Sequence, residues 1–145
     1  MPTEITTAEY QALAELRHRI RIFLREGDFV ARESGLEPQQ YLMLLAIRGL
    51  PGNQEATIRA LADRLAVKHH SAVELIDRLE SHKLVRRTRS RDDRRRVIVS
   101  LLPRGERLLE DVARQRIGEL RASGLALVHA IEALLEPGRN GRKRR

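Results

Sequence analysis

The fold is decided by the stretch SAVELIDRLESHKLVRRTRSRDDRRRVIVSL, residues 71–101. Its first half has apolar residues at helical spacing, which predicts an amphipathic helix that runs from after Val67 to about His82. The apolar face of this helix consists of Ala72, Leu75, Ile76 and Leu79. The second half of the stretch 71–101 predicts two strands, 84–88 and 97–101, which are joined as a hairpin, because β-favouring residues flank a charged turn. We expect Val97, Val99 and Leu101 to alternate inward.

The turn of this hairpin contains an unusual density of positive charge. Seven arginines lie in the eleven positions 86–96, offset only by Asp92 and Asp93, so the segment carries a charge of +5. The C-terminal segment 139–145 carries another +5, whereas the whole chain has a formal net charge of +8. The remainder is therefore slightly acidic. Positive charge concentrated in two patches indicates a polyanionic partner, such as nucleic acid or an anionic membrane.

Composition narrows the classes of protein further. The 145-residue chain contains no cysteine, which excludes disulfides and thiolate metal sites. No stretch approaches the roughly 20 apolar residues of a membrane span, and the N-terminus lacks a signal-peptide pattern. We therefore expect a cytoplasmic protein that does not bind membranes. Aromatic residues make up only 3% of the chain, so platforms for stacking single-stranded bases or RNA are poorly supplied.

A second short helix precedes the one in the opening stretch. Thr57 can cap it, and its apolar face consists of Ile58, Leu61, Ala62 and Leu65. Two short helices with a tight connection form a helix-turn-helix. The outward stripe of the second helix consists of His70, Ser71, Glu74 and Arg78. Helix-turn-helix geometry places such a stripe in the major groove of DNA.

The hairpin that follows this recognition helix is then a wing. Arginines at the tip of a wing can enter a narrow minor groove, where the negative potential is enhanced. We expect Asp92 and Asp93 to orient neighbouring guanidinium groups and to pin the loop, with Asp93 bracing Arg95. The predicted DNA-binding residues are Lys68, His69, His70, Ser71, Glu74, Arg78, Arg91, Asp93, Arg94, Arg95 and Arg96.

Helices also flank the helix-turn-helix on both sides. Thr6 and Glu9 have the spacing of a capping box at the start of the first helix, and Pro103 opens a long helix that Ser123-Gly124 interrupts. The apolar stripes of these outer helices exceed what so small a domain can bury, which favours a homodimer. We predict one domain over 1–136, with a winged helix-turn-helix at about 37–102, dimerisation helices at about 6–34 and 103–136, and a basic disordered tail at 137–145.

The motifs IRALADRLAV, SAVELIDRLESHKLVRR and DDRRRVIVSL, in this order, resemble those of the multiple-antibiotic-resistance regulator (MarR) family of bacterial winged-helix transcription factors. The resemblance implies a mainly α fold with a small β-hairpin wing. It also implies a homodimer that binds a pseudo-palindromic operator, and in many members a small aromatic or phenolic effector that releases the DNA. The family's Asp-x-Arg wing motif falls on Asp93 and Arg95.

Three positions depart from the family pattern. Lys68 stands where a Ser or Thr usually caps the recognition helix, and Lys83 stands where a Gly usually separates helix and wing. Lys83 must adopt a left-handed conformation or bend the exit from the helix differently. Leu102 stands where a Thr usually caps the next helix, which should cost about 1 kcal/mol relative to a good cap.

Other functions find less support in the sequence. His69 and His70 point about 100° apart on a helix, and neither has a second histidine at i+4, so we expect no bound metal and no cofactor. An enzyme would need convergent titratable groups or a phosphate-binding loop, and the sequence offers neither. Two functions remain: a sequence-specific, ligand-responsive regulator, with repression favoured, or an architectural winged helix that binds DNA non-specifically.

Overall fold

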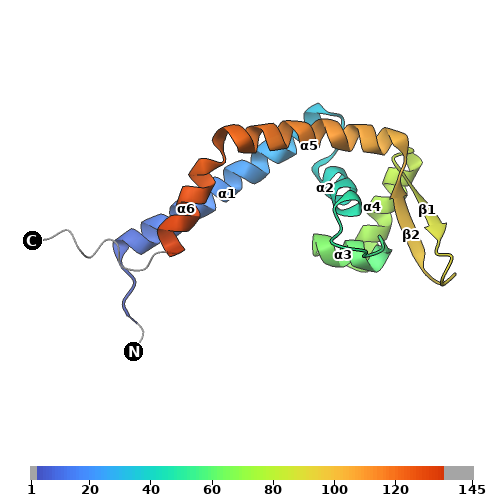
Figure 1. The fold of residues 1–145 in the computed structure, drawn as a ribbon, viewed down its shortest axis with the longest axis horizontal. Coiled ribbons are helices and arrows are strands. Elements are labelled where there is room, and N and C mark those ends of the chain that lie inside the picture. Colours follow the sequence, from blue (N-terminus) through green and yellow to red (C-terminus); the bar gives the residue numbers. More distant parts are fainter. Residues whose placement is uncertain (1–2, 136–145) are drawn as a thin grey trace, which may run out of the picture. The chain divides into compact units, whose positions relative to one another are not determined.

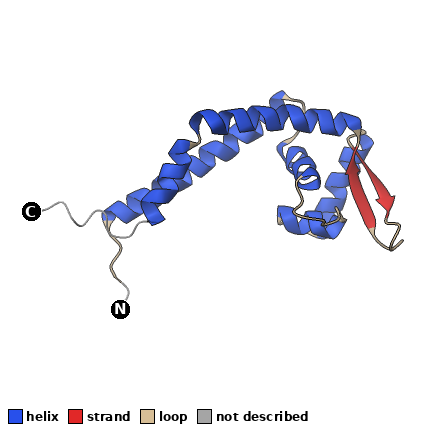
Figure 2. Ribbon diagram, viewed as in Figure 1, coloured by secondary structure: helices blue, strands red, loops and turns tan. Residues whose placement is uncertain are grey.

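The computed structural model describes residues 3–135, which form six helices and one two-stranded antiparallel hairpin (Figures 1 and 2). In chain order these elements are α1 (Thr7–Glu33), α2 (Pro38–Arg48), α3 (Ile58–Leu65), α4 (His69–Ser81), β1 (Val85–Arg89), β2 (Val97–Leu101), α5 (Pro103–Ser123) and α6 (Leu125–Leu135). The predicted fold class, mainly α with a β-hairpin, is confirmed. The predicted tail at 137–145 lies outside the described residues.

The chain divides into two compact units. One comprises residues 28–115 and contains α2, α3, α4, the hairpin and the adjoining ends of α1 and α5. The other comprises residues 1–27 and 116–145, which include the remainder of α1 and α5 together with α6. No helix within residues 3–135 is long and apolar enough to cross a membrane.

The core of the unit 28–115 lies among α2, α3, α4, the hairpin and the part of α5 that belongs to this unit. Fully buried side chains include Met43, Leu44, Leu61, Ile76, Leu79, Val85, Val99 and Val112. Each such side chain stabilises the fold by about 1.5–3 kcal/mol when removed from water. The predicted apolar face of α4 is confirmed: Ala72, Ile76 and Leu79 are buried and Leu75 packs against them.

The hairpin has a third, very short partner. β1 and β2 pair in antiparallel register from Val85 opposite Leu101 to Arg89 opposite Val97. On its other edge β2 forms a bridge from Ile98 to Thr57, and the Val99 N–H donates to the Ala56 carbonyl at 2.9 Å. β2 is therefore paired through its backbone on both edges, with β1 on one and with residues 56–57 on the other.

The predicted alternation along β2 is confirmed only in part. Val99 is buried, but Val97 and Leu101 are only half-buried, and so are the residues on the opposite face, Ile98 and Ser100. The expected inward alternation thus holds at Val99, which is buried, and at Leu101, which packs against the core, whereas Val97 is not part of the core cluster. The bridge to Thr57 is made at the free edge of β2, through backbone groups.

The ends of α3 and α4 follow the sequence closely. The Thr57 hydroxyl accepts the Ala60 N–H at 3.1 Å and caps α3 as predicted. Lys68 occupies the N-cap of α4 in an extended conformation, and its side chain forms no capping hydrogen bond. Lys83 has φ +59° and takes the left-handed alternative. The Leu84 N–H then donates to the Leu79 carbonyl at 2.9 Å, which closes the C-terminus of α4.

The start of α5 packs tightly against the chain that leads into β1. The Leu102 N–H donates to the Leu84 carbonyl at 2.9 Å. Gly105 approaches the same carbonyl so closely that an added β-carbon would lie 2.1 Å from its oxygen. Because no real β-carbon makes such a contact, this first turn of α5 requires glycine at position 105.

Within the other unit, α1 and α5 are joined by a buried arginine. Arg116 is 6% exposed; its guanidinium donates to the Phe23 carbonyl at 2.6 Å and to Glu119 Oε2 at 2.5 Å. The same guanidinium carbon lies 4.4 Å from the centre of the Phe23 ring, in cation–π geometry. Gly27 leaves room for it, since an added β-carbon would lie 3.2 Å from Arg116 Nε.

The same unit leaves many large apolar side chains uncovered. The predicted capping box forms at its start, with the Thr6 N–H donating to Glu9 Oε2 at 2.7 Å, and α5 breaks at Gly124 as expected. The exposed apolar side chains are Ile5, Tyr10, Leu13, Ile20, Leu24, Ile117, Leu120, Leu125, Val128, Ile131 and Leu135. A single chain therefore does not bury the apolar stripes that the sequence shows.

Candidate nucleic-acid interface

The outer face of α4 is one part of the candidate interface. His70, Glu74 and Arg78 are exposed, while Ser71 is half-buried. The other two DNA-binding residues predicted for α4, Lys68 and His69, are exposed at the N-terminal end of the helix. The structure thus presents five of the six predicted residues fully to solvent and the sixth in part.

The wing loop, residues 90–96, is the other part, and its own hydrogen bonds give it a defined shape. Ser90 is buried, and its N–H donates to the Arg96 carbonyl at 2.9 Å. The Arg96 N–H donates to the Asp93 carbonyl at 3.0 Å, and the Arg95 N–H donates to Asp93 Oδ1 at 3.0 Å. The loop is therefore a closed turn that fixes where its side chains emerge.

Asp93 pins this loop through the backbone and not through a guanidinium group. Its carboxylate accepts the N–H two residues further on, the pattern of an Asx-turn, which the short side chain favours. Within residues 3–135 neither Asp92 nor Asp93 forms an ion pair with an arginine. The prediction that Asp93 pins the loop is confirmed. The prediction that these aspartates orient guanidinium groups is wrong.

The seven arginines of 86–96 fall into two groups. Three of them have partners in the protein: Arg87 pairs with α4, Arg96 pairs with Glu55, and Arg89 donates to the Arg94 carbonyl at 2.9 Å. The other four are exposed and form no ion pair with any described residue. These free arginines are Arg86, Arg91, Arg94 and Arg95. Only part of the charge in this segment is thus available to a partner.

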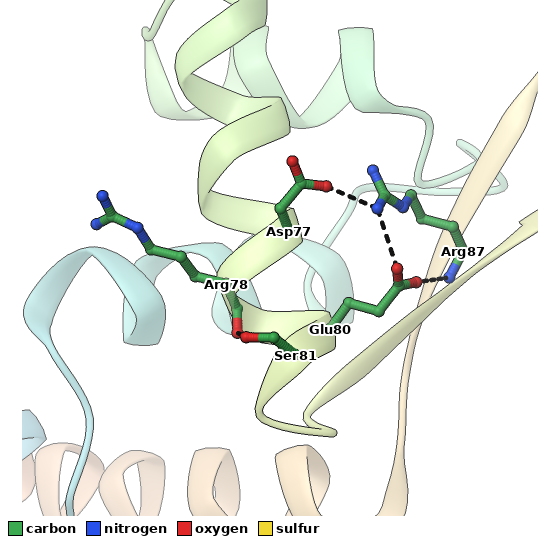
Figure 3. A network of polar contacts seen from close by, with 5 residues as sticks. All are labelled: Asp77, Arg78, Glu80, Ser81 and Arg87. Atoms are coloured by element: carbon green, nitrogen blue, oxygen red, sulfur yellow. Dashed lines mark hydrogen bonds and ion pairs between the residues drawn. The ribbon is translucent and has the colours of Figure 1, made fainter.

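Arg87 joins the base of the wing to the recognition helix (Figure 3). Its Nη2 lies 2.6 Å from Asp77 Oδ1 and 3.0 Å from Glu80 Oε1, and its backbone N–H donates to Glu80 Oε2 at 3.0 Å. The side-chain and backbone hydrogen bonds from Arg87 lower the pKa of Glu80, and the hydrogen bond to Glu80 raises the pKa of Arg87. Arg78 points away from this network.

The triad of Arg87, Asp77 and Glu80 is not among the residues predicted from the sequence. The signal was present in part, because Asp77 and Glu80 lie three residues apart on one face of a helix, and an arginine-rich strand follows directly. Which of the arginines they bind depends on the hairpin register, which places Arg87 opposite Val99 and on the inner face.

The described residues form no cluster that could serve as a metal site in place of this interface. In the range 3–135, no three of the His, Asp and Glu side chains converge in a way that could hold a metal ion. His69 and His70 are exposed. The chemistry on offer is that of an exposed helix face beside a stiff loop with free guanidinium groups, which suits a phosphate backbone and base edges.

Comparison with known proteins agrees with this geometry. The profile of the MarR family matches residues 34–96. The "Uncharacterized HTH-type transcriptional regulator YsmB" of Bacillus subtilis (strain 168) is 31% identical over 106 residues, which cover 73% of this chain and 70% of the relative. The chain belongs to the MarR family. It is a transcription regulator with the family's winged-helix fold.

Solved MarR-type structures share this fold. A MepR variant of S. aureus bound to an oligodeoxyribonucleotide has a TM-score of 0.63 and 20% identity, covering 91% of this chain and 94% of that one. CouR of Rhodococcus jostii, bound to p-coumaroyl-CoA, has a TM-score of 0.65 and 22% identity, covering 83% and 85%. At these identities the likeness concerns the fold.

Proposed function

We propose that this MarR-family regulator is a homodimer that binds a pseudo-palindromic operator and represses transcription until a small ligand releases it. The observation that supports the proposal is an exposed recognition-helix face together with a wing segment in which four of the seven arginines form no ion pair with any described residue. A helix of this kind fits the major groove, and free guanidinium groups on a narrow hairpin fit the minor groove.

Base recognition belongs to α4 in this proposal. Arg78 can donate two hydrogen bonds to a guanine, and Glu74 can accept one from a cytosine amino group. Lys68, His69, His70 and Ser71 lie at the N-terminal end of the helix, where the proposed partners are phosphates and bases. Arg91, Arg94 and Arg95 contact the minor groove, and Arg96 contacts a flanking phosphate.

Two-fold symmetry follows from the proposed dimer. The exposed apolar side chains of α1, α5 and α6 support pairing of two chains through these helices. In a two-fold dimer the two α4 helices would contact half-sites about 34 Å apart, one turn of DNA. The winged helix-turn-helix at about 37–102 would then carry DNA binding, and the outer helices dimerisation.

A small aromatic or phenolic compound is the proposed effector. The p-coumaroyl-CoA held by CouR contains a phenol, and that protein shares the fold of this chain. We place the regulator in the cytoplasm, where its DNA target lies.

Selection of bound fragments from the genome of the source organism tests the proposal. We expect enrichment of a pseudo-palindrome that binds at least about a thousandfold more tightly than random DNA. Arg78→Ala and Glu74→Ala should each relax the preference at one base pair per half-site, by about 1–3 kcal/mol. The alternative is an architectural protein that binds DNA non-specifically, which four free phosphate-binding arginines would also suit. In that case the selection would recover no common sequence. Arg78→Ala and Glu74→Ala would then bind DNA as the wild type does.

A further inference from the structure

Glu55 lies at the foot of the wing, and the backbone holds it there. It belongs to the short segment before α3 that pairs with β2, through the Thr57–Ile98 bridge and the hydrogen bond from Val99 to Ala56. The Thr57 N–H also donates to the Glu55 carbonyl at 2.8 Å. The position of the Glu55 backbone therefore does not depend on the ion pair that the side chain forms.

That ion pair involves an arginine at the end of the wing loop. Arg96 Nη1 lies 3.2 Å from Glu55 Oε2, and the two side chains are 52% and 39% exposed. The backbone of Arg96 is fixed by its hydrogen bonds to Ser90 and Asp93. Only the side chain of Arg96 is thus free to exchange one partner for another.

The ion pair between Arg96 and Glu55 leaves a buried oxygen of the Glu55 carboxylate without a hydrogen bond. Glu55 Oε2 is buried and accepts no hydrogen bond, although the Arg96 guanidinium lies within ion-pair distance. By contrast, Arg87 donates side-chain and backbone hydrogen bonds to Glu80 and contacts Asp77 at 2.6 Å. Two arginines of the wing segment therefore form ion pairs with other elements. Arg87 is held by hydrogen bonds, whereas Arg96 is held by charge attraction alone.

A DNA phosphate would be a better partner for Arg96 than Glu55 is. Phosphate oxygens accept short, charge-assisted and often bidentate hydrogen bonds from arginine, whereas Glu55 offers Coulomb attraction without a hydrogen bond. Since about half of the Arg96 side chain is already exposed, it can turn outward without disturbing the core.

We infer that Glu55 is an affinity-determining residue that acts through Arg96: it holds this arginine in the DNA-free protein and competes with a phosphate for it. Glu55 does not itself contact DNA. Its role is to lower the affinity for every duplex by the free energy of the exchange. The inference rests on the proposed function only in that the wing contacts DNA.

A double-mutant cycle tests this role. The affinities of the wild type, Glu55→Gln, Arg96→Gln and the double variant are measured on a random-sequence duplex and on the fragment recovered by genomic selection. Exposed ion pairs contribute about 0–1 kcal/mol, so Glu55→Gln should bind about two- to fivefold more tightly than the wild type. In the Arg96→Gln background, Glu55→Gln should not change the affinity, because Glu55 then has no arginine to withhold from the phosphate.

Two further measurements make the test specific. Glu106→Gln is the matched control, because it removes the same charge from an exposed ion pair, with Arg48, that lies outside the wing; its affinity should equal that of the wild type. Arg96→Gln should reduce the slope of log K against log salt by about one unit, as the loss of one phosphate contact requires, and Glu55→Gln should keep the full slope.

Three results would overturn the inference: an unchanged affinity for Glu55→Gln, a weaker one, or an equal gain with and without Arg96, which would indicate long-range repulsion. Failure of the proposed function looks different. In that case no operator is recovered, while the random-sequence duplex still reports the exchange at Arg96.

Discussion

Seven arginines that look alike in the sequence have different surroundings in the folded protein. Arg87 is held by two carboxylates and Arg96 by one; Arg89 donates to a backbone carbonyl, and the other four form no ion pair with a described residue. The sequence shows how many positive charges the segment 86–96 contains. It does not show which are already paired, because Glu55 lies more than thirty positions away in the sequence and Asp77 on another element. Charge can be predicted from composition, whereas its availability depends on the tertiary structure.

Arg95 is the free arginine on which the family's wing motif falls. Arg95→Ala should weaken binding to all operator variants by a similar factor, because the minor groove offers little base information. It should also lower the slope of log K against log salt by about one unit per lost phosphate contact. Titrations of several operator variants at three salt concentrations would measure both quantities, and a loss confined to one base pair would contradict the assignment.

Asp93 gives a prediction whose sign is informative. Asp93→Ala should weaken DNA binding although it removes a negative charge, because the Arg95 N–H loses its acceptor and the loop loosens. Asp93→Asn is the control, since its side-chain oxygen can accept the same hydrogen bond and should preserve the affinity. Tighter binding by Asp93→Ala would mean that the wing acts only as a positive surface.

Glu80 links stability to pH. Hydrogen bonds from Arg87 lower its pKa in the folded protein, so its contribution to stability is complete above 4.5, the ordinary value, and is lost as the pH falls through the lowered value. The free energy of unfolding of the wild type should therefore fall more steeply below pH 4.5 than that of Glu80→Gln. Denaturant titrations from pH 7 to pH 3 would measure it; parallel curves would exclude a role for this carboxylate.

At the scale of elements, periodicity and capping signals predicted most of the fold. The recognition helix, expected to run from after Val67 to about His82, extends from His69 to Ser81, and the second strand has the predicted bounds. The pairing of β2 with residues 56–57 was not predicted, because a single bridge leaves no pattern in the sequence. The same pairing places Glu55 beside Arg96, so the missed element and the missed site residue have one cause.

Gly105 offers a test of how α5 is attached to the wing. Gly105→Ala should lower the free energy of unfolding by about 1–3 kcal/mol, because its β-carbon would overlap the Leu84 carbonyl. Gly118→Ala on the same helix is the control: no atom lies within 4 Å of an added β-carbon there, so it should stabilise the helix by about 0.5–1 kcal/mol. Equal effects in thermal or denaturant unfolding would contradict the close approach.

At the scale of the whole molecule, the exposed apolar side chains of residues 3–27 and 116–135 are the observation that supports the proposed dimer. The sequence predicted this excess of exposed apolar surface, because the outer helices have apolar stripes that so short a chain cannot bury internally. It could not supply the operator or the effector, which depend on contacts between this protein and other molecules.

The proposed dimer can be tested through Leu120 and Val128, which are 41% and 44% exposed. Replacing both with Glu should abolish dimerisation and DNA binding together, because buried charges would face each other across the interface. Sedimentation at micromolar concentration would measure the first effect and a DNA titration the second. Gln115→Glu, which adds a charge at an exposed position of α5, is the control and should remain dimeric. A monomeric wild type would contradict the prediction.

The bond from the Val99 N–H to the Ala56 carbonyl has a consequence for motion. Hydrogen exchange at this amide requires β2 to separate from the segment that precedes α3, so its protection factor measures how often the wing detaches from the helix-turn-helix. The amides of residues 91–94, at the loop tip, report only local fluctuation. The protection factor of the Val99 amide, its observed rate relative to its intrinsic rate, therefore gives the free energy of wing detachment in the protein without DNA.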